Sequence, residues 1–254
     1  VKDSIRCYGE RGQIMAHAVG GEPSSVGLPY SYTLHQIVGE TDTPLNLSDS
    51  IALNLPEGYY QIEVADTKGR VLKSEMLHLT QPDPLQIEVD AHNVTCKGDG
   101  NGSVHLSAKG GNGGYTYFWN DGVVGADRNR LKPGYYSVTL TDRKHCATTP
   151  SNTPISITEP EKLIIALAKK EVTVAGCDGV IFATVVGGTT PYTYRYNETD
   201  NASDNVIGTL CAGHYTVQVT DHNLCKAADS LLLPPPLVAS VSIRDSVNCY
   251  GDAN

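Results

Sequence analysis

The sequence predicts an all-β protein made of tandem immunoglobulin-like or fibronectin-III-like Greek-key sandwiches, and two observations carry this prediction. Similar strings occur near both ends: residues 2–10 read KDSIRCYGE and residues 244–252 read RDSVNCYGD. Between them, apolar and polar residues alternate with a period of two, which is typical of half-buried strands. No stretch combines a long apolar period of 3.6 residues with helix caps, so helices are not expected.

Five landmarks recur three times in the same order, which indicates a tandem repeat. They are a Gly-Gly pair, a Tyr-x-Tyr, a Leu-x-x-Gly-x-Tyr, an Asp six residues beyond that last Tyr, and a Pro-x-x-Leu. The expected domains are residues 1–82, 83–160 and 161–236, followed by 237–254 as the first strand of a truncated fourth repeat. The landmarks begin at Gly20, Gly110 and Gly187; Tyr30, Tyr115 and Tyr192; Leu55, Leu131 and Leu210; Asp66, Asp142 and Asp221; and Pro82, Pro160 and Pro234.

Each repeat is expected to hold about seven short strands separated by Gly, Pro, Asn and Asp. The first repeat has a longer loop, Glu22–Pro29, after its Gly pair. Alternation gives the inward-facing side chains of four strands. In the second repeat these are Leu85/Ile87/Val89, Val104/Leu106/Ala108, Tyr115/Tyr117/Trp119 and Tyr136/Val138/Leu140.

The Leu-x-x-Gly-x-Tyr element is similar to a tyrosine corner, in which the Tyr opens an inner strand and its hydroxyl bonds to the backbone upstream. Tyr60, Tyr136 and Tyr215 are expected to play this part.

Composition favours an extracellular setting. Repeats of about 80 residues form small cores that usually need reinforcement, and the chain has seven cysteines without a Cys-x-x-Cys spacing. A formal net charge of −9 argues against nucleic acid or an anionic membrane as partner. The longest clean apolar run, residues 163–168, is too short to span a bilayer, so membrane insertion is not expected.

The repeat resembles the SprB-type repeat of giant cell-surface adhesins in gliding and related Bacteroidota. The second repeat carries the resemblance in Val94-Thr95-Cys96-Lys97-Gly98, Tyr115-x-Tyr117-x-Trp119, Pro133-Gly134-Tyr135-Tyr136 and Asp142-x-x-x-Cys146. The third carries it in Gly187-Gly188-Thr189-Thr190-Pro191-Tyr192 and Leu210-Cys211-Ala212-Gly213-His214-Tyr215. The first repeat departs from the pattern because Arg70 stands where the late Cys is expected.

This resemblance implies type IX secretion, display on the outside of the outer membrane, and a stalk or filament role in adhesion or gliding motility. The expected partners are neighbouring repeats of the same chain, with surface polysaccharide or motility-machinery proteins as further candidates. Two other functions stay open: a glycan- or protein-binding array, and an accessory segment of a secreted enzyme.

No residue set predicts catalysis, a cofactor or a metal. The segment 99–103, DGNGS, starts like a calcium loop, but Val104 and Gly110 occupy the positions where such a loop needs Gly and an acid. The segment 110–114, GGNGG, precedes an aromatic strand and not the helix of a phosphate site. The eight histidines lie at non-equivalent positions, so the chain is not expected to be an enzyme.

The fourteen tyrosines suit either core filling or sugar stacking. Tyr115, Tyr117 and Trp119 fall on one face, which a sandwich usually buries. Tyr59 and Tyr135 point the other way by alternation and are the better candidates for exposed contacts.

The cysteines fall into classes that suggest pairings. Cys177 and Cys211 occur together in the third repeat, and both are missing from the other two, so they are expected to pair. An early class holds Cys7, Cys96 and Cys249, and a late class holds Cys146 and Cys225. If the two classes pair within a repeat, or if each late Cys pairs with the early Cys of the next repeat, some Cys is set against a position that holds another residue. Pairing each late Cys with the early Cys of the preceding repeat gives Cys7–Cys146 and Cys96–Cys225 with no such mismatch.

Two further expectations concern the surface and the shape. Asp-Ser followed by an aliphatic residue resembles the O-glycosylation motif of Bacteroidota, which makes Ser4, Ser50, Ser230 and Ser246 candidate sites. Pro82, Pro160 and the Pro234–Pro236 run stiffen short connections, so the repeats are expected to form an extended rod.

Overall fold

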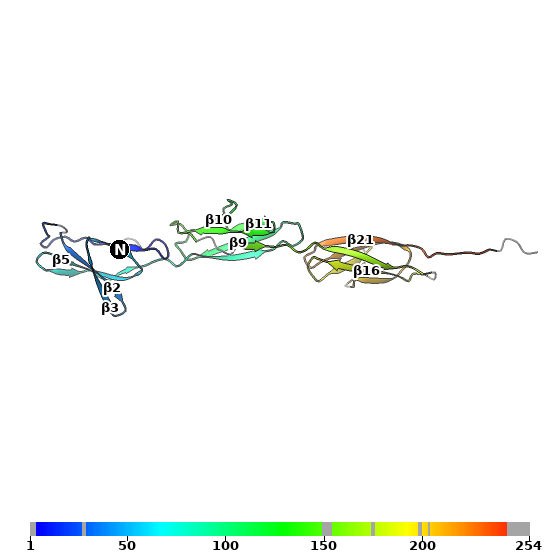
Figure 1. Cartoon of the computed structure of the whole chain (residues 1–254), viewed down its shortest axis with the longest axis horizontal. Helices are drawn as coiled ribbons and strands as arrows, with labels where there is room; N and C mark the ends of the chain where they lie inside the picture. Colours follow the sequence, from blue (N-terminus) through cyan, green and yellow to red (C-terminus); the bar gives the residue numbers. More distant parts are fainter. Residues whose placement is uncertain are drawn as a thin grey trace, which may run out of the picture. The chain divides into compact units, whose positions relative to one another are not determined.

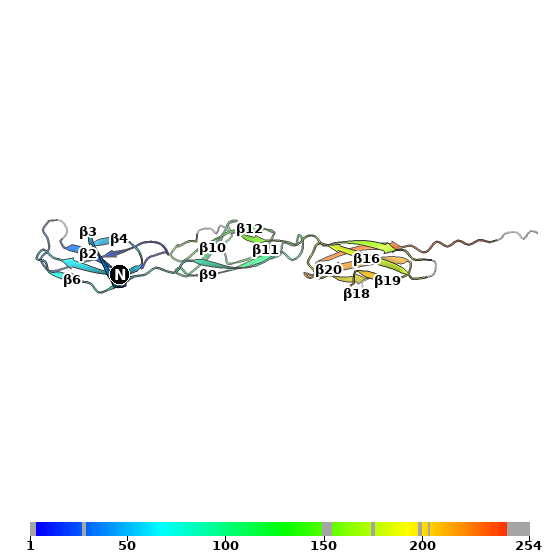
Figure 2. The same cartoon turned by 60° about the horizontal axis from the view of Figure 1, so that its bottom comes forward.

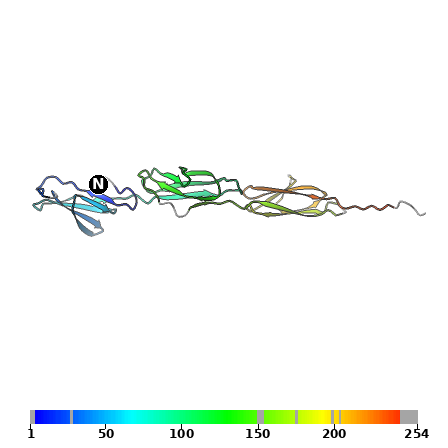
Figure 3. The same ribbon diagram turned by 45° about the horizontal axis from the view of Figure 1, so that its top comes forward.

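The computed structural model describes residues 4–26, 29–148, 154–173, 176–197, 200–202 and 204–242. Within these residues every helix or strand assigned is a strand (Figure 3), which confirms the predicted all-β class. None of the described residues forms a helix able to cross a membrane. Among the described residues, seven strands fall within each of the three sequence repeats.

The strands of the first repeat form two sheets over one core (Figure 1). β1 pairs with β4, while β2 lies between β3 and β5, and β5 also pairs with β6 and β7. Ile14 of one sheet and Tyr32 and Ile62 of the other belong to the same buried cluster. The bounds are β1 Gly12–Met15, β2 Ser31–Val38, β3 Thr41–Leu47, β4 Ile51–Leu55, β5 Gly58–Ala65, β6 Val71–Lys73 and β7 Leu77–Leu79.

The strands of the second repeat form the sheets β11-β9-β8, β10-β13 and β12-β14. Tyr117 and Trp119 on β10 are buried, as their interpretation as core residues requires, and Leu106 on β9 and Leu140 on β13 are buried with them. Tyr135, one position out of phase, is 74% exposed. The bounds are β8 Gln86–His92, β9 Gly102–Lys109, β10 Thr116–Trp119, β11 Asp127–Leu131, β12 Gly134–Tyr136, β13 Val138–Thr141 and β14 Ile155–Ile157.

The third repeat is a two-sheet sandwich in Greek-key order. β15-β16-β19 faces β18-β17-β20-β21, and the chain crosses between the sheets after β16, β18 and β19 (Figure 2). Ile181 of the first sheet and Val217 of the second belong to one core cluster. The bounds are β15 Ile164–Lys170, β16 Gly179–Val186, β17 Thr193–Tyr196, β18 Asp200–Ala202, β19 Val206–Leu210, β20 Gly213–Thr220 and β21 Lys226–Leu233.

By its contacts the chain divides into two compact units. One comprises Val1–His92, Ser103–Arg130 and Gly134–Ile157, and the other comprises Asn93–Gly102, Leu131–Pro133 and Thr158–Asn254. The boundaries near residues 82 and 160 therefore stay predictions. Residues 237–242 are not assigned to a strand, and residues 243–254 lie outside the described residues, so the fourth repeat stays a prediction.

Candidate functional site

The site begins with a tight turn that closes the late hairpin of each repeat. The backbone N–H of Asp66, Asp142 and Asp221 donates to the carbonyl four residues on, at 3.0–3.1 Å. Within the turn Gly69, His145 and Leu224 adopt positive φ angles of 74°, 62° and 67°. This is the geometry of a type I turn followed by a left-handed residue, which lets a short loop join two strands.

Each of these aspartates also holds the turn against the Gly pair. Asp142 Oδ1 accepts bonds from the backbone N–H groups of Lys144 and Cys146 at 2.8 and 2.9 Å, and its Oδ2 accepts one from the N–H of Asn112 at 2.8 Å. A Cβ on Gly111 would lie 2.9 Å from that Oδ2. A methyl group of Leu85 would lie closer still, and φ is +57°, so the second Gly of the pair has no room for a side chain.

Hydrogen bonding favours the charged form of Asp66 and Asp142. The backbone N–H groups of Glu22 and Arg70, together with the Arg70 side chain, lower the pKa of Asp66 to about 2. Burial disfavours the charged form of Asp142. The hydrogen bonds from the side chain and backbone of Asn112, together with those from the N–H groups of Cys146 and Lys144, outweigh this effect. The pKa of Asp142 is therefore also lowered.

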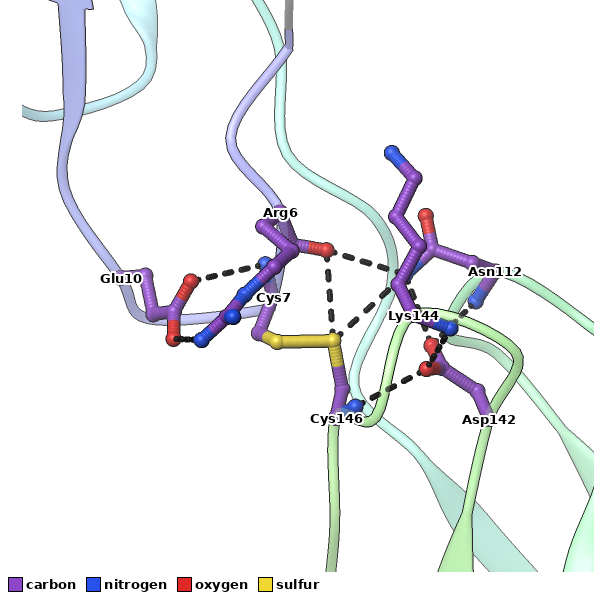
Figure 4. A network of polar contacts seen from close by, with 7 residues as sticks. All are labelled: Arg6, Cys7, Glu10, Asn112, Asp142, Lys144 and Cys146. Atoms are coloured by element: carbon purple, nitrogen blue, oxygen red, sulfur yellow. Dashed lines mark hydrogen bonds and ion pairs between the residues drawn. A yellow bond between two sulfur atoms is a disulfide. The ribbon is translucent and has the colours of Figure 1, made fainter.

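Cys146 lies at the end of this turn and bonds to Cys7 of the preceding repeat (Figure 4). The two Cα atoms are 5.5 Å apart, which is ordinary for a cystine. The Asn112 amide donates to the carbonyl of Arg6 at 2.9 Å and to Asp142 Oδ2 at 2.7 Å. One asparagine therefore links the loop of the first repeat to the carboxylate of the second.

The second junction, between Cys96 and Cys225, repeats this arrangement with a different amide. The Cα atoms are 5.7 Å apart, and the Asn223 amide donates to the carbonyl of Thr95 and to Thr189 Oγ1, both at 3.1 Å. As at Arg6, the accepting carbonyl belongs to the residue just before the early Cys. We call the two sites the cystine junctions.

The early Cys sits in a turn that glycine makes possible. Glu10 N–H donates to the Cys7 carbonyl, with Gly9 at φ 78°; likewise Asp99 N–H donates to the Cys96 carbonyl, with Gly98 at φ 88°. Gln81 accepts from the N–H of Gly9, and Glu159 accepts from that of Gly98, both at 2.8 Å. A polar side chain near the end of the repeat therefore fixes each turn.

The third disulfide, Cys177–Cys211, lies within the third repeat. Its Cys211 carbonyl accepts the hydroxyl of Tyr215 at 3.0 Å, and the Pro56 carbonyl accepts that of Tyr60 at 2.9 Å. Both bonds have the form expected of a tyrosine corner. Tyr136 is the last residue of β12 and is half-buried, with the Arg128 guanidinium carbon 6.0 Å from its ring centre.

Where the first repeat lacks the late Cys, Arg70 completes the turn. Its Nε and Nη2 lie 2.8 and 2.7 Å from Asp66 Oδ2. The guanidinium thus binds the carboxylate that elsewhere supports a cystine.

The glycosylation candidates lie in different settings. Ser4 and Ser230 are exposed, Ser230 on β21, whereas Ser50 is half-buried and donates its hydroxyl to Asp49. Ser246 and Cys249 fall outside the described residues.

The described part of the chain has no group of three or more His, Cys, Asp or Glu side chains able to hold a metal ion. In the loop first considered for calcium, Asn101 is committed to the fold: its Oδ1 accepts from Thr95 N–H at 3.0 Å and its Nδ2 donates to Thr95 Oγ1 at 2.7 Å.

Sequence reasoning missed the amides of the junctions. Asn112 lies in the glycine-rich stretch interpreted as a plain loop, and Asn223 lies beside Cys225 without a landmark of its own. One signal could have pointed to this region: an Asp recurs six residues after the Tyr in all three repeats. A turn that is merely exposed does not require the same residue type in every repeat.

Comparison with known families gives a match within the second repeat. Residues 89–124 match the family model described as SprB repeat. The chain contains a SprB-type repeat. No curated protein matches the sequence.

Three solved structures similar to this chain are arrays of β domains. The three N-terminal domains of the Highly Immunogenic Outer Capsid protein (Hoc) of bacteriophage RB49 are 13% identical, with 90% of this chain and 92% of that chain covered and a TM-score of 0.45. The N-terminal eight Ig domains of Down Syndrome Cell Adhesion Molecule are 12% identical, with 87% and 33% covered and a TM-score of 0.31. Chicken CNTN1 domains FN1–FN3 are 12% identical, with 81% and 90% covered and a TM-score of 0.27.

Proposed function

We propose that this chain is a structural stalk segment of a large bacterial cell-surface adhesin. The SprB-type repeat and the disulfides support an extracellular, adhesin-like repeat region. Its role in adhesion or gliding motility, its export by type IX secretion and its place outside the outer membrane are the finer parts of the proposal. In this role the chain's partners are its own neighbouring repeats, with surface polysaccharide or motility-machinery proteins binding elsewhere on the adhesin.

The observation that carries the proposal is the pairing at the cystine junctions. Each joins the early loop of one repeat to the late turn of the next: Cys7 with Cys146 and Cys96 with Cys225. When such a chain is pulled, the force between two repeats is carried by a disulfide as well as by the polypeptide that connects them. A binding array has no need of this feature, whereas a stalk under tension does.

The proposed shape is an extended rod of three sandwiches with boundaries near residues 82, 160 and 236. A compact chain of 254 residues would have a radius of gyration of about 18 Å. Small-angle X-ray scattering of the oxidised protein is expected to give a much larger radius and the scattering profile of a rod. A radius near the compact value would contradict the stalk.

We also propose O-linked glycans at Ser4, Ser230 and Ser246, with Ser50 the weaker candidate because it is half-buried. Intact-mass measurement of protein purified from its native cells is expected to show added hexose, which Ser230→Ala should reduce. Asp229→Asn is the matched variant, because it removes the acidic residue of the motif and keeps the serine. A native mass equal to that of the bare chain would remove this part of the proposal.

A further inference from the structure

The two junction disulfides overlap along the chain. Cys96 lies inside the loop that Cys7–Cys146 closes, and Cys146 lies inside the loop that Cys96–Cys225 closes. The loops span 139 and 129 residues and share residues 96–146 of the second repeat. A force applied outside Cys7 and Cys225 therefore meets several covalent routes, and the shortest of them sets how far the chain can extend.

One short route turns back within the second repeat. It crosses from Cys7 to Cys146 (Figure 4), follows the backbone for 50 residues back to Cys96, and crosses to Cys225. The backbone alone needs 218 residues to cover the same interval. Each crossing adds little length, because the paired Cα atoms are 5.5 and 5.7 Å apart.

The third repeat lacks the early Cys at which a forward route would leave it. Residues 94–96 read Val-Thr-Cys, and the corresponding residues 172–174 read Val-Thr-Val. The backbone N–H of the Thr donates in both cases to a side chain of the following turn, to Asn101 Oδ1 at 3.0 Å and to Asp178 Oδ1 at 2.7 Å. The matching bonds support this correspondence, so valine stands where the second repeat has its early Cys.

Cys177 and Cys211 supply another connection. The forward route runs 31 residues from Cys146 to Cys177 through β14 and β15, crosses to Cys211, and runs 14 residues through β20 to Cys225. Its 45 residues are close to the 50 of the route that turns back, whereas without this disulfide the forward route needs 79. The disulfide within the third repeat therefore gives the chain a second short route of nearly the same length.

We propose that the three disulfides form one tension-bearing network, which limits extension between Cys7 and Cys225 to the length of 45 residues. Each short route sets the limit when the other is lost, so the network is redundant beyond its first crossing. Residues 8–95 lie on neither route, so strands β1–β7 are shielded from tension. This goes beyond the stalk function, because the network is a property of the chain whatever the adhesin binds.

The test is force spectroscopy on single molecules of the 254-residue chain, held at both ends. All forms carry Cys249→Ser, so that this thiol cannot exchange with the disulfides. The oxidised protein is expected to reach a fully extended length about 600 Å shorter than the reduced protein, which is the difference between 218 and 45 residues at about 3.5 Å per residue.

Removal of one route at a time tests the redundancy. Cys96→Ser, Cys225→Ser should extend no further than the oxidised wild type, because the forward route remains. Cys177→Ser, Cys211→Ser should gain only about 20 Å, because the limit moves from 45 to 50 residues. The variant that lacks both pairs should gain about 120 Å, since its shortest route runs 79 residues.

Removal of the shared crossing tests the other half of the network. Cys7→Ser, Cys146→Ser leaves 89 residues from position 7 to Cys96 as the shortest route, so this variant should gain about 150 Å. A similar length for this variant and the oxidised wild type would show that tension does not cross at Cys7.

An insertion of ten Gly and Ser residues after Ser25 is the matched control for shielding. It lies in the long loop of the first repeat, so it should lengthen the reduced protein by about 35 Å and leave the oxidised protein unchanged. An oxidised chain that lengthens with the insertion, or that extends as far as the reduced chain, would overturn the proposal. A rod-like scattering profile together with either result would retain the stalk and remove the network.

Discussion

Replacing Cys7 and Cys146 together by serine is expected to lower the free energy of unfolding of the second repeat by about 5 kcal/mol. The bond closes a sequence separation of 139 residues, and closing a loop of that size restricts the unfolded chain by about this amount in the chain-entropy model. Urea unfolding followed by tryptophan fluorescence measures it, because the only tryptophan, Trp119, is buried in this repeat.

The control is the double variant Cys177→Ser, Cys211→Ser. It removes a bond with a separation of 34 residues, worth about 4 kcal/mol, from the third repeat. We expect it to leave the Trp119 transition in place. If both double variants move that transition equally, or if the first moves it by less than about 1 kcal/mol, the junction does not stabilise the second repeat as described.

Asp142→Ala is expected to destabilise the same repeat by about 2–4 kcal/mol. The change removes the acceptor for the N–H groups of Asn112, Lys144 and Cys146 and for the Asn112 amide, and buried donors left without partners are costly. The same Trp119 transition measures the loss. Asp229→Ala on β21 is the control: this residue is exposed and its carboxylate accepts only from its neighbour Ser230 in the contacts described.

The acid dependence of stability separates charge from hydrogen bonding. Because the pKa of Asp142 is lower in the folded protein, its contribution is present above the unfolded value near 3.8 and is lost as pH falls through the folded value. Asp142→Asn does not titrate, so its stability should change less than that of the wild type below about pH 4. Equal slopes for the two proteins would contradict a charged Asp142 in the folded state.

Alternation and landmarks were sufficient to predict the fold because the repeats are small and two-layered. In the second repeat Val104 and Leu106 alternate into the core as predicted, and so do Tyr117 and Trp119. The Cys classes led to the pairs Cys7–Cys146 and Cys96–Cys225 because pairing within a repeat leaves Cys7 and Cys225 without partners, and pairing with the next repeat sets Arg70 against Cys96. No knowledge of distance was needed.

The polar parts of the junctions could not be predicted, because hydrogen bonds depend on which groups the turns bring together. Asn112 reaches the Arg6 carbonyl across 106 residues of sequence, and the equivalent amide in the next junction comes from another loop.

Disulfide mapping of the native protein tests the central claim, that cystines link successive repeats. Proteolysis without reduction, followed by mass spectrometry, is predicted to recover one peptide pair joined by Cys7–Cys146 and another joined by Cys96–Cys225. Both pairs should disappear after reduction, and cleavage between the repeats should leave the fragments joined until then. Recovery of Cys96 bonded to Cys146, within the second repeat, would contradict the account.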